Sequence, residues 1–198
     1  LFPVVINYFS PYIIIDGASQ GIVNGSLIVF GAMFLSALVV GRLWCGWACP
    51  MAGLEEACFA VQDKRAAGGR WNWIKWGIWL PWVGIIAAAA VSAGGYHRVD
   101  FFHLTESGIS IDAPDIIYRY AIYYIVLGIV LLLSLTAGRR AFCHYGCRMA
   151  PFMILGRKLR NLGRWPSLRL VAEPAKCKDC HTCTTNCPMS LDVNAMVK

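Results

Sequence analysis

Three apolar stretches of membrane length constrain the fold of this chain more than any other feature. Ile22–Gly41 carries no charge over 20 residues, Trp71–Ala93 has Lys75 near its start, and Ile117–Ala137 also has a cation, Arg119, near its start. A helix rises about 1.5 Å per residue, so about 20 residues cross the hydrocarbon core of a bilayer. Leu1–Ile15 is shorter and holds Pro3 and Pro11, which indicates the remainder of a cut first helix or a re-entrant segment. The sequence therefore predicts about four membrane spans.

The basic residues predict which side of the membrane each loop faces. Lys and Arg gather after the second and fourth spans, at positions 42, 64, 65, 70 and 75 and at positions 139, 140, 148, 157, 158, 160 and 164. Gly94–Asp115 holds only Arg98 as a basic residue. Because Lys and Arg mark cytoplasmic loops, we expect the two basic segments inside, and Gly94–Asp115 and the turn at Asp16–Gln20 outside. This topology explains the net charge of +7 better than nucleic-acid binding does, since the cations never line one face of a soluble domain.

The C-terminal tail carries the most specific motif. Cys177, Cys180, Cys183 and Cys187 are separated by two, two and three residues, and Pro188 follows. This spacing is typical of a [4Fe–4S] cluster, and in two-cluster ferredoxins the fourth cysteine ligates the other cluster. Zinc is the alternative, but structural zinc sites usually use two separated Cys or His pairs. The sequence therefore predicts a ferredoxin-like segment, with Cys187 either closing the same cluster or pairing with cysteines elsewhere.

A second motif occurs twice, 98 residues apart. Arg42, Trp44, Cys45, Trp47, Cys49 and Met51 correspond in type and spacing to Arg140, Phe142, Cys143, Tyr145, Cys147 and Met149. Each copy follows a predicted span, so the sequence predicts two helix-pair repeats related by an axis along the membrane normal. Residues four apart share a helix face, so each pair could present two thiolates to a metal or redox centre. The alternative is that these thiols only pack at helix ends.

Other residues have simpler interpretations. All nine cysteines lie on the predicted cytoplasmic side, where thiols stay reduced, so metal ligation is favoured over disulfides. Cys58 is interpreted as a core thiol. Trp79 and Trp82 could line a quinone pocket or pack between helices, and His97 and His103 are interpreted as loop residues rather than haem ligands. Pro151–Leu162 is basic and amphipathic, which is typical of an interfacial helix.

Together, the segment Gly41–Pro50, the second pair Cys143 and Cys147, and the tail run resemble the NapH/NosR/MauN/CcoG-type membrane polyferredoxin family. The resemblance implies that the tail cysteines are cluster ligands and that Cys45, Cys49, Cys143 and Cys147 are redox-associated pairs. It also implies electron transfer from the quinol pool, or, for CcoG-type members, copper reduction. Arg148 departs from the family pattern, which has proline there, and a second ferredoxin run is absent from this sequence.

The sequence as a whole predicts an all-α, multi-pass protein of the inner (cytoplasmic) membrane. Residues 1–165 form the transmembrane bundle, and residues 166–198 form a cytoplasmic iron–sulfur tail that is half of a two-cluster domain. We expect at least one [4Fe–4S] cluster, with a second cluster and a quinone as further candidates. Expected partners are membrane lipid and other redox subunits. The expected function is electron transfer between quinol and partner proteins, with a metal reductase and a non-catalytic anchor as the rivals.

Overall fold

The chain is almost entirely helical in the computed structural model, which describes residues 8–106, 109–110, 116–164, 166, 173–187 and 189–197. The first part contains α2 (Pro11–Ser19), β1 (Ile22–Asn24), α3 (Gly25–Val39), α4 (Leu43–Trp47), α5 (Pro50–Ala57) and η1 (Cys58–Ala60). The middle contains η2 (Gly69–Trp73), α6 (Ile74–Ser92), β2 (Arg98–Asp100), β3 (Thr105–Glu106), β4 (Ile109–Ser110) and α7 (Ile116–Ala137). The last part contains α8 (Ala141–Tyr145), α9 (Met149–Leu162), η3 (Pro174–Lys176), α10 (Thr182–Thr185) and α11 (Val193–Val197).

The helices differ in length from the predicted spans. Among the described residues, only Gly69–Ser92 is both long and apolar enough to cross a membrane. Gly25–Val39 and Tyr123–Ala137 are shorter apolar helices, although α7 as a whole has 22 residues. Four spans therefore remain a prediction. Of the N-terminal stretch Leu1–Ile15, Pro11–Ile15 lie in α2, and residues 1–7 lie outside the described part.

The predicted span Ile22–Gly41 begins as a strand rather than a helix. Residues 22–24 form β1, which pairs in parallel with β2. The Asn24 side chain accepts a hydrogen bond from the backbone N–H of Leu27 at 2.9 Å, so it caps the N-terminus of α3. Asn24 also donates to the carbonyl of Ile13 in α2. These polar contacts shorten α3 to 15 residues.

The two repeats predicted from the sequence have the same local structure. Each has a long apolar helix, a five-residue helix and a third helix, in the order α3, α4, α5 and then α7, α8, α9. The carbonyl of Trp44 accepts hydrogen bonds from the N–H groups of Ala48 and Cys49. Phe142, 98 residues later, accepts the same bonds from Gly146 and Cys147. The internal repeat is therefore confirmed at the level of individual hydrogen bonds.

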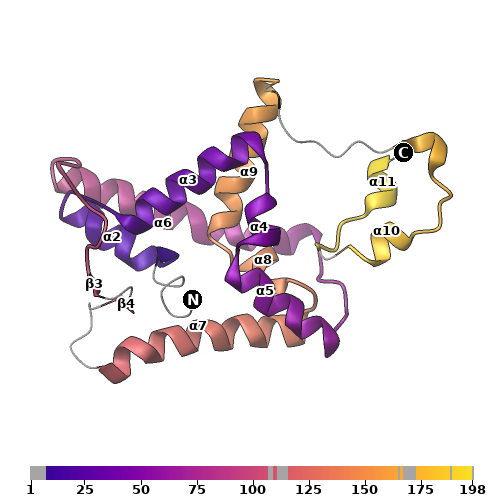
Figure 1. Ribbon diagram of the computed structural model, residues 1–198, viewed down its shortest axis with the longest axis horizontal. Helices are drawn as coiled ribbons and strands as arrows, with labels where there is room; N and C mark the ends of the chain where they lie inside the picture. The colour runs from indigo at the N-terminus through magenta and orange to yellow at the C-terminus, as the bar shows by residue number, and fades with distance from the viewer. Residues whose placement is uncertain are drawn as a thin grey trace.

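The third helix of each repeat packs against the long helix of the other repeat. Helix α9 packs along α3 of the other repeat, and α5 packs against α7 of the other repeat (Figure 1). Gly156 allows close contact between α9 and α3, since a Cβ added there would lie 2.9 Å from the Cβ of Ala37. Small residues at such crossings let helix backbones approach. This reciprocal packing brings the two Cys-x3-Cys motifs to the same region.

An aromatic core joins α3, α6 and α9. Phe30, Trp79 and Trp82 are buried around Phe152, with ring centroids 5.2–6.1 Å from the Phe152 ring. The indole N–H of Trp82 donates to the carbonyl of Pro11 at 3.2 Å. Trp79 and Trp82 thus pack between helices, which was one of the two interpretations of the sequence. The apolar side of α9 is covered by protein at this point, instead of lying free at a lipid surface.

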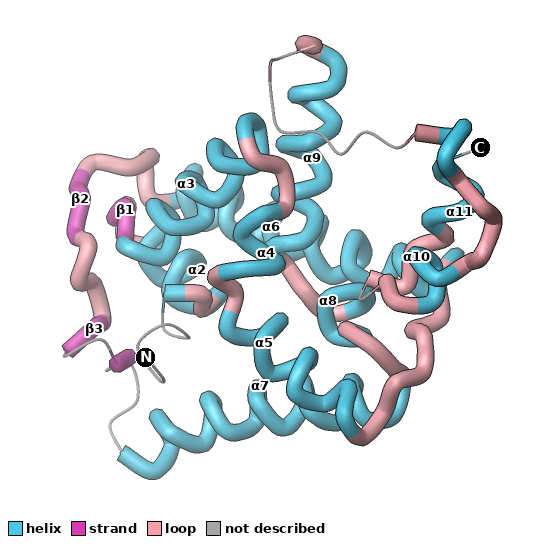
Figure 2. Tube along the Cα trace, turned by 45° about the vertical axis from the view of Figure 1, so that its right-hand side comes forward, coloured by secondary structure: helices cyan, strands magenta, loops and turns pink. Residues whose placement is uncertain are grey.

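The connecting segments gather at two ends of the molecule. The strands lie at one end and the tail helices α10 and α11 at the other (Figures 1 and 2). At the strand end, His103 Nε2 lies 2.8 Å from a carboxylate oxygen of Asp16. At the tail end, the N–H of Arg139 donates to the carbonyl of Lys64 at 2.8 Å. The segments predicted to share the outer side, and those predicted to share the inner side, are therefore neighbours in the structure.

Candidate functional site

The paired cysteines lie at the junction of the two repeats. Cys45 is in α4, Cys49 caps α5, Cys143 is in α8 and Cys147 follows α8. All four are half-buried, and the Cys147 thiol interacts electrostatically with Cys45 and Cys49 of the other repeat. Burial raises the pKa of Cys147 to about 12 and also raises the pKa of Cys45. The structure thus brings both pairs into one sulfur-rich region, hereafter the paired-cysteine site.

The thiols of the described chain are not arranged as a finished ligand set. In the ranges that the structure describes, no three Cys, His, Asp or Glu side chains form a group able to hold a metal ion. The raised pKa values of Cys45, Cys143 and Cys147 favour the protonated thiols at these three positions. Ligation requires thiolates, so binding a metal or cluster here would release protons and draw the sulfurs together.

Glu55 is the most deeply buried acidic residue at this site. Its side chain, with 0% exposure, accepts hydrogen bonds from Ser134 of α7 at 3.1 Å and from the N–H of Phe142 at 2.8 Å. The Cys143 thiol donates to its other oxygen at 2.8 Å. Burial raises the pKa of Glu55, and burial together with the Glu55 charge raises the pKa of Cys143 well above its usual value. Glu55 therefore joins α5, α7 and α8 at the thiol of Cys143.

Replacing Glu55 with Ala is expected to lower the free energy of unfolding by about 2–3 kcal/mol, because buried donors of Ser134 and Phe142 lose their acceptor. Glu55→Gln should cost much less, since its amide oxygen can still accept both bonds. Thermal unfolding of the two variants in detergent would measure the difference. Equal destabilisation by Ala and Gln would contradict this role.

Cationic side chains surround the paired-cysteine site. The charge of Arg42 interacts with Cys45, Cys143 and Cys147, and its Nε atom is buried without a hydrogen-bond partner among the described residues. Lys75, at the start of α6, is 9% exposed and interacts with Cys143 and Cys147. His144 is buried, and burial followed by the Lys75 charge lowers its pKa, so it stays neutral. A four-thiolate iron–sulfur cluster is anionic and its sulfurs accept hydrogen bonds, so this donor set and these cations fit such a group.

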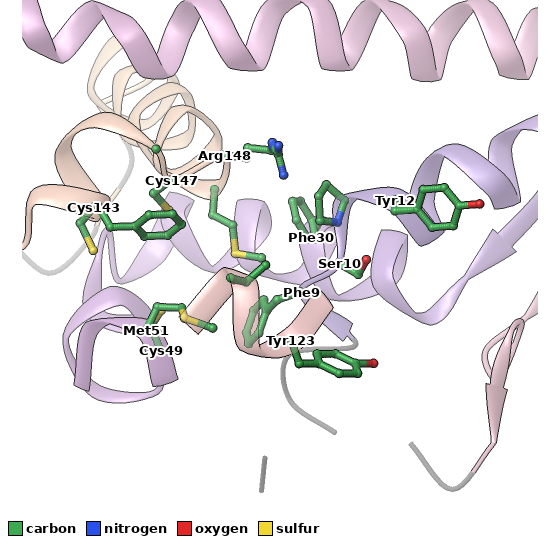
Figure 3. A pocket seen from close by; sticks show the side chains of 15 residues that line it. Phe9, Ser10, Tyr12, Phe30, Cys49, Met51, Tyr123, Cys143, Cys147 and Arg148 are labelled. Carbon is green, nitrogen blue, oxygen red and sulfur yellow. The ribbon is translucent and has the colours of Figure 1, made fainter. Parts of the chain in front are cut away.

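A largely apolar cavity of about 390 Å³ adjoins the cysteines. Cys143, Cys147, Cys49 and Met51 lie at one side of it, and Ser10 and Tyr12 lie at the other (Figure 3). Among the described residues of its lining, Arg148 supplies the only charged side chain. The remaining lining residues are Phe9, Pro11, Phe30, Tyr123, Val126, Phe142, Gly146 and Met149. The volume falls in the range of small-molecule sites.

The tail run forms an exposed loop on the other side of α8. Cys177, Cys180 and Cys183 are exposed, and Cys187 is half-buried. Between them, Asp179 and His181 adopt left-handed backbone conformations, both with φ of 55°, which reverse the chain direction. Hydrogen bonds from the Thr182 side chain and backbone lower the pKa of the Cys180 thiol. Four thiols on a tightly turned loop suit a [4Fe–4S] cluster in donor type and number, provided that the loop closes around it.

Comparisons with known proteins match the two segments that contain the paired cysteines. The "4Fe-4S binding domain" family matches residues 24–65 and 119–161. Each matched segment contains one Cys-x3-Cys pair, while the tail run lies beyond both. The nitrogen fixation protein FixG of Rhizobium meliloti is 27% identical over 201 residues, covering 86% of this chain and 37% of FixG. The methylamine utilization ferredoxin-type protein MauN of Paracoccus denitrificans is 24% identical over 189 residues, covering 93% of this chain and 62% of MauN. This chain carries a 4Fe-4S binding domain and is a distant homologue of FixG and MauN.

The ferredoxin-type resemblance inferred from the motifs is thus confirmed. Protein RdxA of Cereibacter sphaeroides is a further relative, 26% identical over 202 residues, covering 86% of this chain and 40% of RdxA. The chain therefore spans less than two thirds of the length of each of these relatives. No solved structure matches it significantly.

Glu55 was not identified from the sequence, whereas the structure shows the contacts of His97, His103 and Cys58. Glu55 was missed, although it stands 98 residues before the apolar Met153 and is thus a polar residue where its repeat counterpart is buried and apolar. His103 pairs with Asp16, and His97 Nδ1 lies 3.1 Å from the carbonyl of Gly95. Cys58 is buried and its thiol donates to the carbonyl of Leu54, as expected for a core thiol.

Proposed function

We propose that this chain is a membrane-embedded electron-transfer subunit that passes electrons between the quinone pool and partner redox proteins. The observation that carries the proposal is the junction of the repeats, where two Cys-x3-Cys pairs from the 4Fe-4S binding segments meet beside an apolar cavity. Bound clusters would supply one-electron transfer, and the protein would hold them and tune their potential. Cys45, Cys49, Cys143 and Cys147 would hold one cluster, and Cys177, Cys180, Cys183 and Cys187 another.

The cavity beside the paired cysteines is proposed as the quinone site. Aromatic side chains such as Phe30 and Phe142 would pack on a quinone ring, and Arg148 would donate to a ring oxygen. Oxidising a quinol to a quinone releases two electrons and two protons, so an acceptor must lie close to the ring. A cluster held by the cysteines at the cavity wall would accept these electrons one at a time and pass them on to the partner, and the two protons would leave to solvent.

Filling the cavity with a larger side chain is expected to weaken the binding of quinol and so raise its KM. Val126 of α7 lines the cavity, while its neighbour Ile125 is 60% exposed and provides a matched control. In the purified chain, Val126→Trp should raise the KM for a short-chain quinol at least about tenfold, since a steric cost above 1.4 kcal/mol suffices for that change. Ile125→Trp should leave it unchanged. Reduction by dithionite should be the same in both, and equal KM values would contradict the assignment of the cavity.

The second candidate is a metal reductase. Met51 and Met149, which are repeat counterparts, line the cavity together with three cysteines, and soft sulfur ligands suit copper(I). Turnover of copper(II) by the purified chain, without quinol-dependent cluster reduction, would favour this function. The opposite result would favour the quinol-linked carrier.

The proposal includes a location and partners. The chain would lie in the inner membrane as a multi-pass protein, with its basic segments and tail on the cytoplasmic side. The exposed Lys176 and Lys178 beside the cysteine run would attract an acidic redox partner. A non-catalytic anchor remains the third candidate, and it predicts an assembled complex whose electron flow survives loss of the tail cluster.

A further inference from the structure

The tail is held against the membrane part by two arginines that donate to backbone carbonyls. Arg65 Nη2 donates to the carbonyls of Ser190 and Leu191, at 2.9 and 3.2 Å. Arg139 Nη1 donates to the carbonyl of Thr185 at 2.6 Å. The accepting carbonyls lie on both sides of Cys187 in the sequence. The two arginines therefore bind the chain on either side of the last cysteine of the run.

Arg139 is positioned by the membrane part itself. Arg139 forms an ion pair with Asp63, and its side chain is only 9% exposed. The N–H of Arg139 donates to the carbonyl of Lys64, which joins the two basic segments. Gly138 makes this approach possible, because its φ is +107° and a Cβ there would lie 2.5 Å from the Lys64 carbonyl oxygen. The Arg139 guanidinium is therefore held by the membrane part as well as by the tail, and Arg65 lies beside it through a backbone bridge between Arg65 and Arg139.

The tail accepts two further hydrogen bonds from the same surface. Ser190 Oγ accepts from the N–H of Ala66 at 3.1 Å. Arg140, which is ion-paired with Glu56, lies with Nη1 3.6 Å from the sulfur of Met189. Four residues of the tail, at positions 185 and 189–191, thus contact residues 65–66 and 139–140. These four contact residues of the membrane part are hereafter called the arginine bracket.

The arginine bracket lies between the two cysteine sites. Thr185 is two residues before Cys187, and Arg139 is four residues before Cys143. The hydrogen bond from Arg139 to Thr185 therefore closes a short path from the tail run through α8 to the paired-cysteine site. Cys177, Cys180 and Cys183 are exposed.

We infer that Arg65 and Arg139 are positioning residues that dock the cysteine run of the tail on α8, so that the tail works as a fixed relay to the paired-cysteine site and leaves its exposed side for a partner. The docking is independent of the proposed quinol chemistry. Only its use in electron transfer rests on the proposed function.

The test compares the full-length chain, purified anaerobically in detergent, with the double variant Arg65→Gln/Arg139→Gln. Hydrogen–deuterium exchange of the peptides covering residues 184–194 should become at least about tenfold faster, because the lost bonds involve charged donors. Arg98→Gln is the control, since Arg98 is exposed and lies at the strand end. Replacing Arg139 with Lys instead of Gln keeps the charge. The variant Arg65→Gln/Arg139→Lys should therefore exchange more slowly than Arg65→Gln/Arg139→Gln. Unchanged exchange in the double variant at wild-type iron content would overturn the docking.

A second readout separates docking from the proposed function. In the double variant, reduction of the tail cluster by quinol should slow at least tenfold, while its reduction by dithionite should stay as in the wild type. Faster exchange with undiminished quinol-dependent reduction would overturn the relay role. If the wild type shows no quinol-dependent reduction but the exchange result holds, the proposed function fails and the docking stands.

Discussion

Replacing Cys180 with Ser is expected to remove one [4Fe–4S] equivalent of iron and sulfide from the purified chain. Cys180 is the second of the four cysteines of the tail run, its thiol is exposed, and hydrogen bonds from Thr182 favour its thiolate. A hydroxyl is a much poorer ligand for iron in a cubane than a thiolate is. Iron and acid-labile sulfide analysis with EPR of the dithionite-reduced protein would measure the loss.

Cys58→Ser is the matched control for this prediction. Cys58 is buried and its thiol donates to the Leu54 carbonyl, a contact that a hydroxyl can also make. Iron content should therefore stay at the wild-type value. Equal iron in the Cys180 variant and the wild type would show that the tail run holds no cluster. A complex that keeps its electron flow after the loss would favour the non-catalytic anchor.

Gly156→Val is expected to destabilise the packing of α9 on α3. The first added atom would lie 2.9 Å from the Cβ of Ala37 and 3.2 Å from the carbonyl oxygen of Phe34. Both neighbours belong to α3, whose backbone cannot yield without moving the helix. Overpacking of this kind costs about 1–3 kcal/mol or more. Thermal unfolding in detergent would measure it.

The same substitution should also disturb the paired-cysteine site, because the contact of α9 with α3 sets the distance between the repeats. Gly31→Val provides the control on α3, since a Cβ at Gly31 meets nothing within 4 Å. It should raise stability by a few tenths of a kcal/mol at most, because valine has a higher helix propensity than glycine. Similar melting temperatures for both variants would contradict the close packing of α9 on α3.

The repeat and the cysteine positions could be predicted because they depend on local spacing. The match between Arg42–Met51 and Arg140–Met149 indicated two equivalent units, and their equivalent hydrogen bonds confirm it. The basic loops were also predicted to share one side, and Arg139 does contact Lys64. The family match at both segments supports the same repeat.

Contacts between distant segments could not be predicted in the same way. The exchange of α5 and α9 between repeats depends on the fit of small residues such as Gly156 and Ala37, which a hydropathy pattern does not reveal. Helix α3 begins at Gly25 rather than at the predicted Ile22, because Asn24 caps the helix and residues 22–24 pair with β2. Glu55 was missed because its partners Ser134 and Phe142 lie about 80 residues away in the sequence.

The most direct test of the account is the iron, zinc and acid-labile sulfide content of the intact chain, with EPR, purified anaerobically beside variants at Cys45 and Cys143. The account predicts a coloured protein with equal amounts of iron and sulfide, a reducible [4Fe–4S] signal, and a partial loss of iron in each variant. A colourless protein without iron, or zinc in place of iron, would contradict it.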